Sequence, residues 1–102
     1  MRKLTALIAD DEKIMCAALR SQLEKTPYIE VIGECHDGQV ALDSVKLLKP
    51  DIVFLDIRMP GLTGLEVAAE IDKHDSPPEI VFVTAYDEYA LKGYEVSATD
   101  YI

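Results

Sequence analysis

The sequence predicts an α/β domain in which a doubly wound parallel sheet carries helices on both faces. Short apolar runs alternate along the chain with segments that are apolar on one side only. Each run is apolar at nearly every position, which is typical of strands covered on both faces. Strands and helices that alternate in this way form parallel sheets with right-handed crossovers.

The elements of the first half are bounded by clear signals. Leu4–Ala9 is predicted to be a buried strand, and residues 12–25 a helix with one apolar face. Residues 28–35 alternate polar and apolar positions, which indicates a strand at the edge of a sheet. Asp37 can cap a following helix, which Pro50 ends.

The second half repeats the alternation. The predicted elements are a strand over residues 52–55, a helix from a capping box at 63–66 to about His74, a strand over 80–83, a short helix over 87–93 and a strand over 98–102. The five strands and their helices account for the whole chain, so we expect one domain over residues 1–102.

Composition narrows the possible functions. The chain has 102 residues, of which 49% are apolar, enough for one hydrophobic core. Ten Lys and Arg residues against 19 Asp and Glu residues leave a net charge of −9. Because nucleic acids and anionic membranes bind basic patches, this charge argues against both as direct partners and favours a site for cations.

The cysteines and apolar runs indicate an ordinary intracellular domain. Cys16 and Cys35 form no CxxC pair, and we interpret them as core residues in a reducing compartment. Cys35 and His36 are sequence neighbours, so on a strand they point to opposite faces. No signal peptide is visible and every apolar run is too short to cross a bilayer, so we expect a cytoplasmic protein.

Acidic residues follow two of the predicted strands. Asp10 and Asp11 follow the first strand, Asp56 follows the third, and Thr84 follows the fourth. Because ligands bind at the carboxyl ends of parallel strands, these carboxylates converge if the first and third strands are neighbours. A divalent cation neutralises carboxylates at such short range, and a few oxygen ligands suit Mg²⁺.

The sequence lacks the motifs of nucleotide-binding sites and of common nucleophilic active sites. The first strand–helix turn has neither GxGxxG nor GxxxxGK[ST], which argues against a dinucleotide cofactor and against a P-loop nucleotide site. No Ser-His-Asp or Cys-His arrangement occurs at the predicted strand ends. A carboxylate beside a metal can attack phosphorus to form an aspartyl-phosphate, and Thr84 could donate a hydrogen bond to a phosphoryl oxygen.

These motifs carry a resemblance to a known family. Asp10-Asp11, then Asp56-x-x-Met59-Pro60-x-x-x-Gly64, then Thr84-Ala85, resemble the receiver domain of bacterial two-component response regulators. The resemblance covers the whole chain in order and spacing. It implies the flavodoxin-like receiver fold, with strand order 2-1-3-4-5.

The resemblance also implies a role for each matching residue of the acidic site. Asp56 matches the phosphoacceptor, whose phosphoryl donor is a phosphohistidine on a sensor histidine kinase. Asp11 matches the carboxylate that binds Mg²⁺ directly, and Asp10 matches its water-linked neighbour. The resemblance further implies that Asp56 and the backbone carbonyl at the position of Arg58 bind the metal.

Further matches concern signalling. Thr84 matches the switch hydroxyl and Tyr101 the switch aromatic, which reshape the fourth-helix/fifth-strand face after phosphorylation. Residues 84–91 and 98–102 resemble receivers attached to LytTR-type DNA-binding domains, which implies transcription regulation and contact with DNA only through a domain that this sequence lacks. A homodimer through the fourth-helix/fifth-strand face is left open, and no membrane partner is implied.

One feature of the family is missing. Family members place a Lys followed by Pro shortly after the position of Tyr101, and then a fifth helix. This sequence ends at Ile102, and neither Lys13 nor Lys92 matches that position. We therefore expect a receiver domain that lacks the last helix and is truncated before it.

Simpler and competing explanations remain open. The acidic triplet at residues 10–12 could be a favourable helix start, and Asp56 a turn residue. The chain could be a receiver-like interaction module that is never phosphorylated. A Mg²⁺-dependent phosphatase with an Asp nucleophile is disfavoured, because residues 56–58 lack the second Asp of a DxD motif and follow the third strand. On the leading hypothesis the chain is no metabolic enzyme and catalyses only its own phosphotransfer and dephosphorylation.

Overall fold

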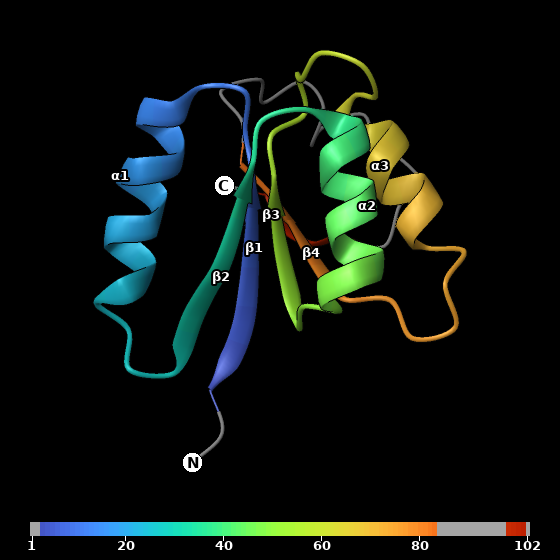
Figure 1. The fold of residues 1–102 in the computed structure, drawn as a ribbon. Coiled ribbons are helices and arrows are strands. Elements are labelled where there is room, and N and C mark those ends of the chain that lie inside the picture. The colour runs from blue at the N-terminus through green and yellow to red at the C-terminus, as the bar shows by residue number, and fades with distance from the viewer. Residues whose placement is uncertain (1–2, 84–97, 102) are drawn as a thin grey trace.

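A computed structural model describes residues 3–83 and 98–101 of the chain and shows a parallel sheet between helices (Figure 1). The elements are β1 (Leu4–Ala9), α1 (Lys13–Glu24), β2 (Ile29–Cys35), α2 (Gly38–Leu48), β3 (Ile52–Leu55), α3 (Gly64–Ile71), β4 (Glu79–Phe82) and β5 (Ala98–Tyr101). The strands pair in the order β2-β1-β3-β4-β5, and each pair is parallel. The predicted α/β architecture is confirmed, and this order is the one that the resemblance implies.

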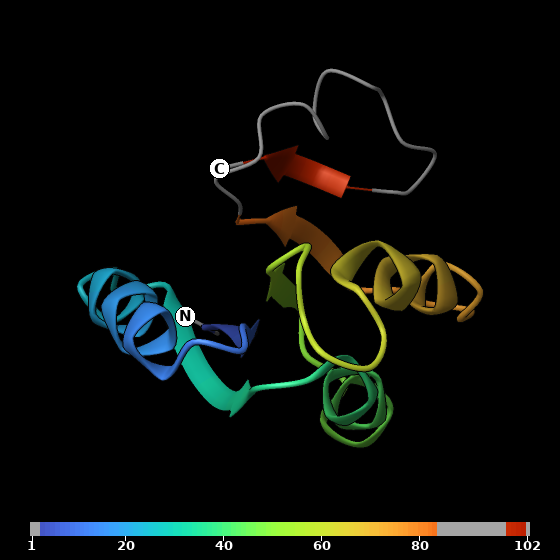
Figure 2. The same ribbon diagram turned by 90° about the horizontal axis from the view of Figure 1, so that it is seen from above.

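The helices lie on both faces of the sheet, α1 on one side and α2 with α3 on the other (Figure 2). Alternate residues of β1 therefore enter different cores. Leu7 belongs to the cluster shared with α2 and α3, whereas Ile8 packs with Cys16 of α1. Both side chains are almost fully buried. This double coverage explains why β1 is apolar at successive positions.

Side-chain caps mark where α2 and α3 begin. The Asp37 carboxylate accepts a hydrogen bond from the Val40 N–H at 2.8 Å, and α2 starts at the next residue, Gly38. Thr63 and Glu66 form a reciprocal capping box at the start of α3. Both caps confirm the sequence prediction, and the second fixes the helix that follows the Asp56 loop.

The end of α3 differs from the sequence prediction. The helix ends at Ile71 rather than near His74. The N–H groups of Lys73 and His74 instead donate to carbonyls three residues back, those of Glu70 and Ile71. This tighter turn leads to Pro77 and Pro78, which cannot supply backbone donors to a continuing helix.

The amino-terminal ends of β1 and β3 are linked by side chains. The Asp51 carboxylate accepts hydrogen bonds from the N–H and the hydroxyl of Thr5, at 2.8 and 3.1 Å. The Asp51 N–H in turn donates to the Thr5 carbonyl at 2.9 Å. These bonds keep the two strands in register at one end, so that their carboxyl ends are aligned at the other.

Some sequence predictions lie outside the described residues. They are the short helix over residues 87–93 and the position of Thr84. Across residues 3–83 and 98–101, no helix combines the length and the apolar character that a bilayer span requires.

Candidate functional site

The site begins where β1 and β3 end. The two strands are direct neighbours, and Ala9 pairs with Leu55. The Asp56 N–H continues this ladder by donating to the Ala9 carbonyl at 2.8 Å. On the other side of β1, the Asp10 N–H donates to the Cys35 carbonyl of β2 at 2.9 Å. Asp10 and Asp56 are therefore held side by side by backbone pairing, as the sequence analysis required.

Three carboxylates converge at this edge of the sheet. One carboxylate oxygen from each of Asp10, Asp11 and Asp56 lies within 4.8 Å of the other two. Asp10 is buried, with 8% of its surface exposed, Asp56 is partly buried and Asp11 is exposed. The donor set consists of hard oxygen atoms open to solvent on one side, which fits Mg²⁺ with several retained waters. Within the described part of the chain, no other cluster of His, Cys, Asp or Glu has this geometry.

The cluster is electrostatically costly without a cation. Burial raises the pKa of Asp56 to about 6, and the charges of Asp10 and Asp11 add to the effect, although the N–H groups of Arg58 and Ile57 oppose it. The pKa of Asp10 is also raised, chiefly by burial, against the lowering effect of the Glu12 N–H. The ionised forms of Asp10 and Asp56 are unfavourable here because they are partly removed from water and lie near other negative charges. A cation bound between them would stabilise these ionised forms.

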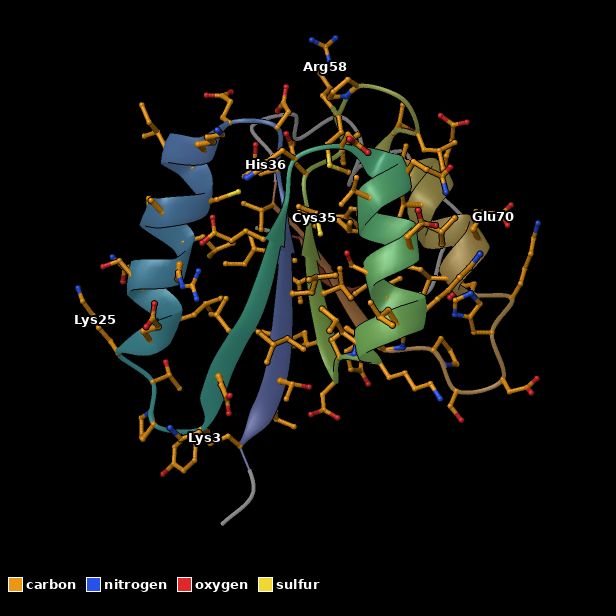
Figure 3. The ribbon with its side chains drawn as sticks, in the orientation of Figure 1. Lys3, Lys25, Cys35, His36, Arg58 and Glu70 are labelled. Carbon is orange, nitrogen blue, oxygen red and sulfur yellow. The ribbon has the colours of Figure 1, made fainter. Side chains whose placement is uncertain are left out.

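The loop after β3 orients the Asp56 carboxylate. The Arg58 N–H donates to Oδ1 of Asp56 at 3.4 Å. The Arg58 side chain is exposed and points away from the body of the protein (Figure 3). The role of the Arg58 backbone carbonyl as a metal ligand stays a prediction.

The Met59-Pro60-x-x-x-Gly64 motif holds this loop against the core. Met59 is buried in the larger hydrophobic cluster, and the Pro60 carbonyl accepts a hydrogen bond from the Gly38 N–H at the start of α2, at 3.2 Å. Gly64 begins α3 and donates its N–H to the Ile57 carbonyl at 2.8 Å. The motif thus ties both helices of this face to the residues around Asp56.

Two residues contact the site in a way that the sequence analysis did not predict. Nδ1 of His36 lies 3.0 Å from the Asp10 carbonyl oxygen, and the Cys16 thiol donates to the same oxygen at 3.4 Å. His36 follows the edge strand at the carboxyl end of the sheet (Figure 3). The only feature of the sequence that could have indicated this contact is the position of His36 directly after a strand predicted to lie in the same sheet.

The cysteines behave as predicted. Both are buried free thiols. Burial raises the pKa of Cys16 to about 11 and raises that of Cys35 as well, so neither is activated as a thiolate. Cys35 contacts Ser44 of α2 whereas His36 contacts Cys16 of α1, so the two neighbours do point to opposite faces.

The switch residues are only partly placed. Thr84 lies outside the described residues. Tyr101 is in β5, where its backbone pairs with Phe82 of β4. The roles of Thr84 and Tyr101 as switch residues stay predictions.

Comparison with known proteins identifies the family. Residues 6–102 match the response regulator receiver domain. The chain belongs to this family. The match begins within β1 and includes every residue of the acidic cluster.

The chain is also similar to part of longer proteins named as regulators. It is 46% identical over 99 residues to the sensory transduction protein LytT of Bacillus anthracis, covering 97% of this chain and 40% of LytT. It is 43% identical over 99 residues to the transcriptional regulatory protein BtsR of Salmonella typhi, covering 97% of this chain and 41% of BtsR. The receiver therefore spans about two-fifths of the length of the curated relatives it matches.

Solved structures agree with the fold. The response regulatory domain of mrkE from Klebsiella pneumoniae superposes with a TM-score of 0.89 at 33% identity, covering 97% of this chain and 81% of that one. The flavodoxin-like receiver architecture is thus shown by the comparison as well as by the sheet topology.

Proposed function

We propose that this receiver accepts a phosphoryl group on Asp56 from the phosphohistidine of a sensor histidine kinase. The convergence of Asp10, Asp11 and Asp56 within 4.8 Å carries the proposal. An aspartate that only ends a strand does not require two other carboxylates beside it. Like charges this close repel one another unless a bound cation neutralises them, so the cluster favours a cation site. Membership of the response regulator receiver family supports the same assignment.

The chain's own residues would hold Mg²⁺ at this edge. We assign direct ligation to Asp11 and Asp56, a water-mediated contact to Asp10 and a backbone carbonyl ligand to Arg58. The different exposures support this division, because the exposed Asp11 is accessible to a hydrated ion whereas Asp10 is buried and accepts the Glu12 N–H at 2.9 Å. Bound Mg²⁺ supplies the positive charge that lets an anionic phosphoryl group approach an anionic carboxylate.

Asp56 is the nucleophile in this proposal. One of its carboxylate oxygens forms a bond to phosphorus as the bond between phosphorus and the kinase histidine nitrogen breaks. The leaving imidazole keeps the electron pair of that bond and takes up a proton from solvent. The Arg58 N–H on Oδ1 orients the carboxylate for this in-line approach.

The phosphorylated state would end by hydrolysis on the same domain. A water oxygen bonds to phosphorus, the bond to the Asp56 oxygen breaks, and inorganic phosphate leaves. The receiver is in this sense no metabolic enzyme, because the group that reacts is part of the chain itself.

The output is proposed from the relatives. One relative is a sensory transduction protein named LytT and another a transcriptional regulatory protein. We propose that Thr84 and Tyr101 transmit phosphorylation to the fourth-helix/fifth-strand face, and that this face controls a LytTR-type DNA-binding domain in the full-length polypeptide. DNA would then be contacted through that domain, in keeping with the net charge of −9 on this one.

Acetyl phosphate tests the phosphoacceptor directly. We expect the full-length polypeptide that contains this sequence to gain one phosphoryl group with acetyl phosphate and Mg²⁺, and to gain none when Mg²⁺ is chelated. Intact-mass spectrometry measures the gain, and peptide mapping after borohydride reduction locates it. The Asp56→Asn variant should stay unmodified, whereas Asp75→Asn, an exposed carboxylate outside the cluster, should react normally.

A folded polypeptide that gains no phosphoryl group would contradict this function. It would favour the alternative of an interaction module that is never phosphorylated. Steady release of phosphate from added phosphomonoesters would instead favour a phosphatase.

A further inference from the structure

The peptide group that joins Asp10 to Asp11 is held by side chains from two other elements. His36 follows β2, and Cys16 lies in the first turns of α1. Nδ1 of His36 lies 3.0 Å and Sγ of Cys16 lies 3.4 Å from the Asp10 carbonyl oxygen, and these two atoms lie 3.8 Å from each other. A carbonyl oxygen has two lone pairs, so the Asp10 oxygen can accept a hydrogen bond from each of these side chains.

The contact requires a proton on each donor. A carbonyl oxygen only accepts hydrogen bonds, so the 3.0 Å contact is a hydrogen bond in the His36 tautomer that carries its proton on Nδ1. Cys16 must be a thiol rather than a thiolate. Its burial agrees with this, because the pKa of the Cys16 thiol is raised to about 11.

The same residue is anchored at its other polar groups. The Asp10 N–H donates to the Cys35 carbonyl, and Oδ1 of Asp10 accepts the Glu12 N–H. Asp11, by contrast, is an exposed residue. The orientation of its carboxylate depends on the peptide plane from which its own N–H and Cα extend, and that plane is the one fixed by His36 and Cys16.

We propose that His36 and Cys16 are positioning residues for the cation site, which hold the Asp10–Asp11 peptide in the orientation that directs both carboxylates toward Asp56. The inference rests on the proposed function for the identity of the cation. Neither side chain would touch the metal or the phosphoryl group. Groups that orient metal ligands in this way commonly change metal affinity strongly when they are removed.

A matched pair of His36 variants tests the proposal. His36→Asn keeps an N–H donor at nearly the position of Nδ1, whereas His36→Leu has a similar volume and no donor. We expect His36→Leu to raise the Kd for Mg²⁺ about tenfold in calorimetric titrations, and His36→Asn to stay within about twofold of wild type. A smaller increase is expected for Cys16→Ala than for His36→Leu, because a thiol is a weak donor.

A second readout needs no metal. Hydrogen bonds to the Asp10 carbonyl polarise the peptide whose N–H belongs to Asp11. In the metal-free protein, the Asp11 amide proton should therefore shift upfield in His36→Leu and remain near its wild-type position in His36→Asn. A role in packing alone would not separate these two variants at that one amide.

Ser44→Ala provides the control on the opposite face of the sheet. It removes the hydroxyl that accepts the Cys35 thiol at 3.4 Å, a contact of the same kind that does not involve the Asp10 carbonyl. We expect it to leave the Mg²⁺ affinity unchanged, whatever it does to the melting temperature.

The outcomes separate this inference from the proposed function. Suppose that the wild-type protein binds Mg²⁺ and is phosphorylated. Equal Mg²⁺ affinities of the His36→Leu and His36→Asn variants would then overturn the inference alone. A tenfold difference in a protein that binds Mg²⁺ without being phosphorylated would support the inference and overturn the function. A wild-type protein that binds no Mg²⁺ would overturn both.

Discussion

Gly64 lies directly against the backbone of Asp56, so that a Cβ atom at position 64 would overlap the Asp56 carbonyl oxygen. The same glycine starts α3 and bonds to the carbonyl of Ile57. A side chain of any size at this position would have to displace either the helix or the residue that we propose as nucleophile. Steric overlap therefore explains why a glycine occupies this position of the motif in this chain.

Replacement of Gly64 by alanine should damage both stability and the site. We expect Gly64→Ala to lower the free energy of unfolding by about 2–4 kcal/mol, because the atom in its way is backbone and cannot rotate aside. Urea denaturation measures the loss. Gly61→Ala is the control: Gly61 has φ of +76° and open space around it, so it should lose only about 1 kcal/mol, from backbone strain. Equal losses in the two variants would contradict the steric explanation.

Mg²⁺ should stabilise the folded domain, and Asp11 should be needed for the effect. A ligand that binds only the folded state raises the melting temperature by mass action. We expect a rise of several degrees in saturating Mg²⁺ for wild type, a rise at most half as large for Asp11→Asn, and an unchanged rise for Asp75→Asn. Differential scanning fluorimetry in Mg²⁺ and in chelator measures it. A full response in Asp11→Asn would remove Asp11 from the ligand set.

The hydrogen bonds between Thr5 and Asp51, at the end of the sheet opposite the site, should contribute to the stability of the fold. Asp51→Ala leaves the Thr5 N–H and hydroxyl without their carboxylate acceptor, and we expect a loss of about 1–3 kcal/mol in the free energy of unfolding. Thr5→Val removes only the hydroxyl and should cost less. If Thr5→Val proved the more harmful change, the N–H bond would not be the main contribution.

The strands and the acidic cluster could be predicted from the sequence because their signals are local. β1 is apolar at every position except Thr5, β3 is apolar throughout, and each strand is followed at once by an aspartate. Parallel pairing then brings those aspartates to one edge, with no further information needed. The caps of α2 and α3 were equally local, since an Asp or Thr bonds to an N–H three residues ahead.

The contacts of His36 could not be predicted because they are not local. His36 and Asp10 are 26 positions apart, and their approach depends on the register of β2 against β1, which shifts between Ala6 and Leu7. It also depends on how closely α1 packs on β2, which brings Cys16 to the same oxygen. No periodicity in the sequence encodes either quantity.

The end of α3 escaped prediction for a related reason. The apolar pattern and His74 both suit a longer helix, but backbone bonding changes to a tighter turn after Ile71. The chain must reach β4 within a few residues after that point, and this tertiary requirement prevails over the weak preference of the sequence for helix.

Replacement of Asp56 should stabilise the metal-free domain in a pH-dependent manner. The pKa of Asp56 is about 6 in the folded protein against an ordinary value of 3.8. A raised pKa in an acid means that folding favours the protonated form, so stability is greatest below the ordinary value and falls as the pH rises through about 6. Above that pH the carboxylate costs the folded state about 1–3 kcal/mol, allowing for its partial exposure.

Asp56→Asn should therefore be more stable than wild type by about that much at about pH 7.5 in chelator, and by little at about pH 4, as measured by urea denaturation. Asp75→Asn should show no such dependence, and Mg²⁺ should reduce the advantage of Asp56→Asn because a cation removes the repulsion that the wild-type carboxylate suffers. A gain of equal size at both pH values would show that the effect does not come from the charge of Asp56.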